Sequence, residues 1–257
     1  MDACGTDEAS ADALARVIEG EILPRLRLLR RPPGQARNAT RQPTASEKER
    51  LHALLLAPGP VDLGTEVAAL LGGDMALETV LLDLLVPAAR HLGAIWEEDL
   101  CDFMAATEGL GRLQTLTHHM CVGLEEDARR AERSILLMPC PGETHLYGLS
   151  VVASFFRRAG WDATILNWTE PDAAHLLREG WFDAVGLSLA CDVHLPVMRD
   201  TVSALRCASR NPALAVIVGG PWFARHEADA RAVDADAYMA DAQAAPSLVK
   251  ALLDARE

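Results

Sequence analysis

The stretch MPCPGETHLYGLSVVASFF, residues 138–156, indicates most clearly which fold to expect in the C-terminal half of the chain. The apolar run at 134–140 stops at a proline and a glycine, and the polar sequence Glu-Thr-His follows at 143–145. Apolar residues at helical spacing then begin after Gly148. This order predicts a strand, a turn and a helix.

The same order recurs along the rest of the chain. Expected strands cover 134–140, 162–167, 183–190, 214–220 and 236–240, and expected helices cover about 146–159, 171–180, 195–209, 224–234 and 243–255. The strands are continuous apolar runs, as strands buried on both faces should be. Residues 132–257 are therefore predicted to be an α/β domain, with a five-stranded parallel, Rossmann-like (flavodoxin-like) sheet.

The preceding region follows a helical pattern. Apolar-periodic segments at about 47–57, 62–72, 75–95 and 102–124 predict a helical bundle over 46–127, which opens on an expected capping box from Ser46 to Glu49. Pro87 is expected to kink the third segment. Residues 1–45 are expected to hold one helix, at 11–29, and a linker rich in proline and arginine at 30–44.

Composition narrows the functional classes. The 257 residues carry a formal net charge of −13, which disfavours direct binding to the phosphate backbone of DNA. The first residues show neither the basic nor the apolar region of a signal peptide, and no run approaches the ~18 apolar residues of a membrane helix. The six cysteines are scattered, as is typical of reduced thiols. A cytoplasmic protein with no membrane segment is expected.

His145 is the candidate metal ligand. It lies on the loop that leaves the first strand, and ligands of such sheets bind beyond the carboxyl ends of the strands. Glu143 could accept the proton of the other imidazole nitrogen, and Gly142 and Gly148 would allow a bulky ligand close to the backbone. The alternative is a polar helix N-terminus with an incidental histidine.

Three matches at strand ends resemble the cobalamin-binding domain family of the methionine-synthase type. Its signature is Asp-x-His-x-x-Gly, a Ser-x-Leu strand end and then Gly-Gly. The resemblance implies that His145 replaces the benzimidazole of cobalamin as lower axial ligand, and that the displaced tail enters a slot. Two departures are Glu143 for aspartate and Ala190 for leucine. The implied cofactor-binding residues are Trp96, Gly142, Glu143, Thr144, His145, Leu146, Gly148, Ser188, Ala190, Gly219, Gly220 and Trp222.

Residues 86–114 resemble the helical cap that covers the upper face of cobalamin in this family. The resemblance implies that Trp96 lies over the corrin ring, whereas an isolated tryptophan would favour core packing. Cobalamin photoreceptor repressors carry Trp-x9-Glu-His. In this sequence Thr107 stands at the position of that histidine, so this ligand is missing. His118 or His119 is then a possible upper ligand of the metal, and helix packing or surface exposure is the alternative role.

The sequences WEEDLCDF (96–103), GLGRLQ (109–114) and IEGEILPRL (18–26) resemble a narrower group, the AerR/PpaA-type antirepressors of photosynthesis-gene regulation. Their SCHIC-like sensor domain takes cobalamin or haem. The resemblance implies a light- or redox-responsive regulator, not an enzyme, that binds a DNA-binding repressor of the CrtJ/PpsR type.

Other functions remain open at this stage. The chain could be a corrinoid carrier subunit of a methyltransferase or mutase, or a haem-binding redox sensor. A photoreceptor that binds DNA directly would need an N-terminal helix-turn-helix of about 70 residues, and about 45 precede the predicted cap.

Overall fold

The computed structural model describes residues 41–71, 75–121, 131–143, 146–166, 173–226 and 229–256. The chain divides into two compact units, and the boundary between them in the sequence falls between Gly123 and Leu124. The helix predicted at 11–29 and most of the linker at 30–44 lie outside the described residues.

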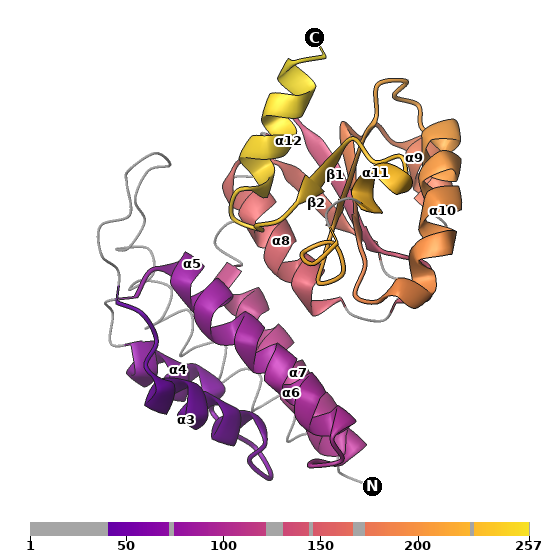
Figure 1. The fold of residues 1–257 in the computed structure, drawn as a ribbon. Coiled ribbons are helices and arrows are strands. Elements are labelled where there is room, and N and C mark those ends of the chain that lie inside the picture. The colour runs from indigo at the N-terminus through magenta and orange to yellow at the C-terminus, as the bar shows by residue number, and fades with distance from the viewer. Residues whose placement is uncertain are drawn as a thin grey trace, which may run out of the picture. The chain divides into compact units, whose positions relative to one another are not determined.

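The first unit is helical, as predicted (Figure 1). Its core is aliphatic, and helices α3, α4, α6 and α7 pack against one another around it. The described elements of this unit are α3 (Ala45–Leu55), α4 (Leu63–Leu71), α5 (Leu77–Thr79), the π-helical segment η2 (Val80–Leu85), α6 (Val86–Glu97) and α7 (Phe103–Cys121).

The capping box of the first helix lies two residues earlier than predicted. The Thr44 hydroxyl accepts a hydrogen bond from the Glu47 N–H at 3.3 Å, and the Glu47 carboxylate accepts one from the Thr44 N–H at 2.7 Å. Arg41 also forms an ion pair with Glu47. The prediction of a box from Ser46 to Glu49 is wrong because Thr44 and Glu47 have the same spacing and the added support of Arg41.

Helical structure is continuous from Leu77 to Glu97, and it is π-helical just before Pro87. Proline has no N–H to donate, so a wider turn accommodates the missing hydrogen bond. By length and composition this stretch of 21 residues could cross a membrane, which the sequence reading did not expect. Its apolar face packs in the core of the helical unit, where Val80, Leu84 and Leu92 are almost fully buried.

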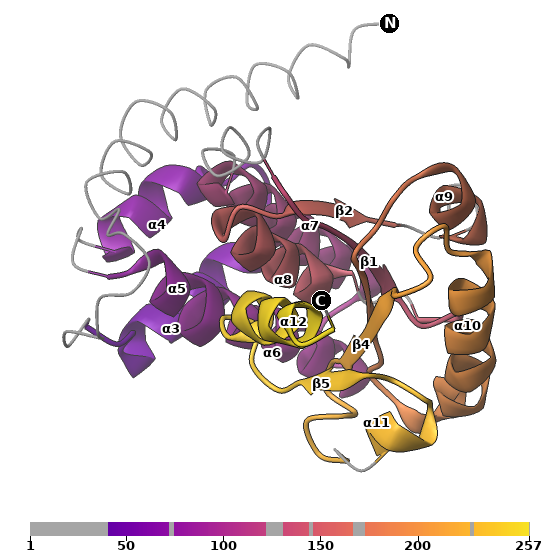
Figure 2. The ribbon, with the colours of Figure 1, turned by 90° about the horizontal axis from the view of Figure 1, so that it is seen from above.

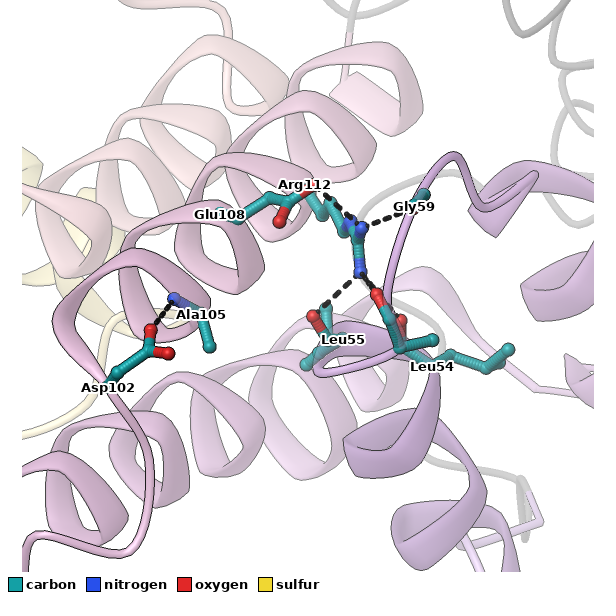
Figure 3. Close-up of polar contacts among 8 residues, drawn as sticks. Leu54, Leu55, Gly59, Asp102, Ala105, Glu108 and Arg112 are labelled. Carbon is teal, nitrogen blue, oxygen red and sulfur yellow. Dashed lines mark hydrogen bonds and ion pairs between the residues drawn. The ribbon is translucent and has the colours of Figure 1, made fainter.

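One arginine of α7 binds both the last residues of α3 and the segment that follows them (Figure 3). The Arg112 guanidinium donates to the carbonyls of Leu54, Leu55 and Ala57 at 3.1, 2.9 and 2.8 Å and to that of Gly59 at 2.6 Å. These contacts satisfy carbonyl groups that the end of α3 leaves without helical partners. Three residues earlier, Gly109 brings α7 close to α3, since a Cβ there would lie 3.1 Å from the Leu55 carbonyl oxygen.

The second unit is a five-stranded parallel sheet in the order β2-β1-β3-β4-β5, which confirms the predicted fold class (Figures 1 and 2). The three central strands are buried, mainly aliphatic runs, whereas the two edge strands are only partly buried. The strands are β1 (Ser134–Pro139), β2 (Asp162–Ile165), β3 (Ala184–Ser188), β4 (Ala215–Gly219) and β5 (Ala237–Met239).

Helices cover both faces of this sheet, with α8 and α12 on one face and α9 and α10 on the other (Figure 2). Phe156 of α8 and Val249 of α12 pack on the first face, and Leu177 of α9 and Val202 of α10 pack on the second. The helices are α8 (Tyr147–Arg158), α9 (Ala173–Glu179), the 3-10 turn η5 (Asp192–His194), α10 (Leu195–Ala208), α11 (Asp229–Ala232) and α12 (Ala245–Asp254).

The helix predicted at 224–234 is shorter than expected, and α11 covers only Asp229–Ala232. The preceding residues form turns because Trp222 is tied to the loop after β3: its N–H donates to the Leu189 carbonyl at 3.1 Å. The N–H groups of Arg225 and His226 then bond back to the Trp222 carbonyl. The start of the predicted helix is therefore held as a loop at the carboxyl edge of the sheet.

Candidate functional site

The carboxyl ends of β1 and β3 form the point where strand order reverses. From β1 the chain crosses to β2 on one side, and from β3 it continues to β4 and β5 on the other side. Loops at such a point separate from each other and leave a crevice at the edge of the sheet, where ligands of open α/β sheets bind. The segments after Pro139 and Ser188, which are paired neighbours in the sheet, are the first candidates for ligand contacts.

Glu143 bridges these two segments. Its side chain is buried, and its Oε1 accepts hydrogen bonds from the N–H groups of Ala190 at 3.1 Å and Cys191 at 3.3 Å. Its own N–H donates to the Cys140 carbonyl at 2.9 Å and closes the turn after β1. A carboxylate offers about four lone-pair sites, so Glu143 can hold the β3 loop and still accept an imidazole proton.

Gly142 allows a histidine to approach this turn from the second segment. Its φ is +92°, and a Cβ at this position would lie 2.6 Å from Cε1 and 2.7 Å from Nδ1 of His194. Any other residue would therefore be strained and would collide with the ring. The sequence predicts that Gly142 lets a ligand come close to the backbone, and in the structure the group beside it is the half-buried His194.

Cys140 links the same turn to the loop that carries His194. It is fully buried, and its thiol donates to the His194 carbonyl at 3.4 Å. Burial, with the nearby Glu143 carboxylate and Cys191, raises the pKa of the Cys140 thiol to about 12. The thiol therefore stays protonated across the physiological pH range and acts as a hydrogen-bond donor.

The ends of β3 and β4 meet backbone to backbone. Gly220 has a φ of +99°, and a Cβ there would lie 2.6 Å from the Leu189 carbonyl oxygen and 2.9 Å from Ser188 Oγ. The Leu189 N–H donates to the Gly219 carbonyl at 3.0 Å. The predicted serine and glycine residues are thus neighbours in space, and no side chain separates them.

The N-terminal part of the expected motif lies partly outside the described residues. Thr144 and His145 are not described, so their predicted contacts stay predictions. Leu146 precedes α8 and packs on the core of one sheet face. Gly148 is exposed in the first turn of α8, with open space where a Cβ would lie.

Trp222 stacks on His226 with ring centroids 3.9 Å apart, and it packs partly on the core under the sheet edge. Ala190 contributes through its backbone N–H, which donates to Glu143, and not through its small side chain. Both residues thus lie on the loops that end β4 and β3.

In the helical unit, four large apolar residues are exposed where α6 ends and α7 begins. Trp96 is 49% exposed, and the exposure of Leu100, Phe103 and Met104 is higher still. The Thr107 hydroxyl donates to the Phe103 carbonyl, so it serves its own helix. Exposed apolar residues of this size commonly mark a contact with a ligand or partner.

His118 and His119 lie near the other end of α7. They are exposed and half-buried, respectively, and their rings meet edge to face with centroids 5.8 Å apart. At 1.5 Å per residue, His118 lies about 22 Å along the helix from Phe103.

Cys191 and His194 are the site residues that sequence reasoning missed. Both follow the third strand, on the same loop as the Ser188 match. The spacing Cys-x-x-His directly after a buried strand was a visible signal, because the carboxyl ends of neighbouring parallel strands share one edge.

Comparison with known proteins identifies the class of the second unit. Residues 133–249 match the model of the B12 binding domain family. The match covers this part of the chain only, and it confirms the predicted cofactor, cobalamin.

Two further similarities concern larger parts of the chain. It is 27% identical over 158 residues to an uncharacterized 20.5 kDa protein in the bchF-crtJ intergenic region of Rhodobacter capsulatus, which covers 60% of this chain and 82% of that protein. The monomethylamine corrinoid protein of Methanosarcina barkeri aligns with a TM-score of 0.59 at 14% identity, over 79% of this chain and 94% of its own. This second likeness supports the fold.

A cobalamin-binding protein from Desulfitobacterium hafniense is also similar, at 18% identity over 95% of this chain and 97% of its own. Its TM-score is 0.42.

Proposed function

We propose that this protein is a cobalamin-binding antirepressor that responds to light or redox state and binds a DNA-binding repressor of the CrtJ/PpsR type. The observation that carries the cofactor part is Glu143, a buried carboxylate that spans the point of strand reversal two residues before His145. In this proposal His145 is the lower axial ligand of the cobalt, and Glu143 accepts the proton of its other ring nitrogen.

The described residues fit such a cofactor. Gly219 and Gly220 bring backbone to the sheet edge without side chains, and Ser188 adds a hydroxyl beside them. In this proposal the nucleotide tail of the cofactor lies beside this polar edge, where no side chain projects from the glycines. When bound, cobalamin supplies a light-absorbing cobalt centre whose axial ligands can change. The exposed Trp96 is the residue of the helical unit proposed to contact the corrin.

Two observations support the regulatory part. The similar Rhodobacter protein is encoded beside crtJ, as its description states. The net charge of −13 opposes direct binding to DNA and favours action through another protein. A coupling of about 1–3 kcal/mol between cofactor state and partner binding would change occupancy by one to two orders of magnitude.

The cofactor assignment is tested by titrating the full-length protein with hydroxocobalamin and following the visible spectrum. His145→Ala should abolish tight binding or leave the benzimidazole coordinated to cobalt, whereas the exposed His175→Ala should bind like wild type. The same titration with haem tests the alternative cofactor. An unchanged affinity and spectrum in His145→Ala would contradict the assignment.

The regulatory role is tested by gel shift with a CrtJ/PpsR-type repressor and its promoter DNA. The cobalamin-loaded protein should alter the repressor's shift and give none alone. A specific shift by this protein alone at physiological salt would overturn the proposal. Methyl transfer to or from the bound cobalamin in the presence of a methyltransferase would instead favour the corrinoid carrier role, with which the fold likeness to a corrinoid protein is compatible.

A further inference from the structure

A second set of possible metal ligands meets at the carboxyl edge of the sheet. Among the described residues, one carboxylate oxygen of Glu143, the Cys191 sulfur and one ring nitrogen of His194 all lie within 4.8 Å of one another. Glu143 is buried, His194 is half-buried and Cys191 is exposed. We propose that Glu143, Cys191 and His194 form a binding site for a divalent cation of the zinc class.

The backbone fixes the Glu143 carboxylate and brings the other two residues beside it. Two N–H groups of the β3 loop fix the Glu143 carboxylate, and the Cys191 sulfur lies 3.6 Å from the same oxygen. The His194 ring packs against Gly142, where no Cβ is present, and the Cys140 thiol holds the His194 carbonyl. The arrangement is thus built by both strand ends and does not depend on surface side chains alone.

The donor set selects the cation. A sulfur, an imidazole nitrogen and a carboxylate oxygen suit zinc and similar metals, whereas magnesium and calcium take oxygen ligands. Zinc bonds of about 2.0–2.3 Å require ligand atoms roughly 3.5 Å apart in a tetrahedral site. The Glu143–Cys191 pair already has this spacing, and rotation of the exposed Cys191 and half-buried His194 side chains would bring the remaining pairs closer.

The site shares Glu143 with the proposed cofactor site. A cation on Glu143 would occupy the carboxylate that His145 is proposed to use, so zinc and cobalamin should weaken each other's binding. This consequence rests on the proposed function, whereas cation binding itself does not.

The test is calorimetric titration of the full-length protein, purified without added cobalamin and kept reduced with a phosphine, with Zn²⁺. One equivalent should bind, and Cys191→Ser and His194→Ala should each weaken it by at least about 10-fold. The matched controls Cys207→Ser and His175→Ala change exposed residues elsewhere in the same unit and should bind like wild type. Absence of saturable binding, or equal affinity in all four variants, would overturn the proposal.

A second readout is independent of stability. Cd²⁺ should produce a sulfur-to-cadmium charge-transfer absorption that is lost in Cys191→Ser and kept in Cys207→Ser. If the absorption persists in Cys191→Ser, the proposed site is wrong. Hydroxocobalamin titrations of wild type separate the two proposals, because failure to bind cobalamin would leave the zinc results unchanged, and failure to bind zinc would leave the cobalamin results unchanged.

Discussion

The two units of this chain place their important groups by different physical means. The α/β unit relies on backbone conformation, with glycines at positive φ and N–H groups that fix Glu143. The helical unit relies on side chains, with an aliphatic core and one guanidinium that binds four carbonyls. A site made by backbone groups can therefore be predicted from a short motif, whereas a site made by long side chains cannot.

Gly220→Ala should have the largest effect on stability, because it disrupts the backbone contact between the ends of β3 and β4. The new Cβ would lie 2.6 Å from a backbone oxygen at a φ of +99°, so we expect a loss of at least about 3 kcal/mol in unfolding free energy or a failure to fold. Urea unfolding followed by circular dichroism measures it. Gly93→Ala, in an exposed part of α6 with open space around it, should stabilise the helical unit by up to about 1 kcal/mol. Equal stabilities of the two variants would contradict this reading.

Arg112→Met should have the next largest effect on stability, and it tests the helical unit. Four carbonyl groups lose a charged donor that is mostly buried, so we expect a loss of about 2–3 kcal/mol in the same unfolding measurement. Arg50→Met removes an exposed ion pair with Glu66 and should change stability by less than about 1 kcal/mol. A loss in Arg50→Met as large as in Arg112→Met would show that the network around Arg112 has no special weight.

Glu143→Gln separates the cofactor role of this residue from its structural role. A glutamine oxygen can still accept the N–H groups of Ala190 and Cys191, so the fold should persist, but the negative charge that is proposed to support His145 is removed. We expect about 10-fold weaker binding of hydroxocobalamin in a spectroscopic titration. Glu179→Gln, on the exposed surface of α9, should leave the affinity unchanged. Wild-type affinity in Glu143→Gln would remove the support for this carboxylate as the partner of His145.

A histidine pair should give the smallest effect, and it concerns the helical unit alone. His52 of α3 stacks on His91 of α6 with centroids 4.0 Å apart, and burial, followed by the charge of His91 and then of Lys48, lowers the pKa of His52 against the opposing effect of Glu49. The unfolded chain therefore takes up a proton more readily than the folded chain. Stability should fall as pH drops below the unfolded pKa of about 6.5.

His52→Phe keeps an aromatic ring for the stack but cannot titrate. Melting temperatures measured from pH 8 to pH 5 should decline less in this variant than in wild type, whereas the exposed His175→Phe should keep the wild-type slope. An unchanged slope in His52→Phe would exclude His52 as the source of the pH dependence.

The comparison also explains which local details could be read in advance. Apolar periodicity predicts the helical bundle. It does not predict the N-cap of α3 correctly, because the structure uses Thr44 and not Ser46. The ion pair between Arg41 and Glu47 that supports this cap depends on how the chain approaches α3. The helix expected at 224–234 was shortened because Trp222 bonds to the loop after β3. Both errors come from contacts that local patterns do not contain.

The amino-acid sequence alone was enough to predict the alternation of strands and helices, the parallel sheet and the glycines at its carboxyl edge. These features follow from local periodicity and from backbone conformations that only glycine adopts readily. The side chains that contact Glu143 could not be predicted in this way, because they depend on how the strands pair. Cys191 lies 48 residues from it in the chain and becomes its neighbour because β3 pairs directly with β1. Arg112 likewise finds its carbonyl partners more than 50 residues away, because helices α3 and α7 pack side by side.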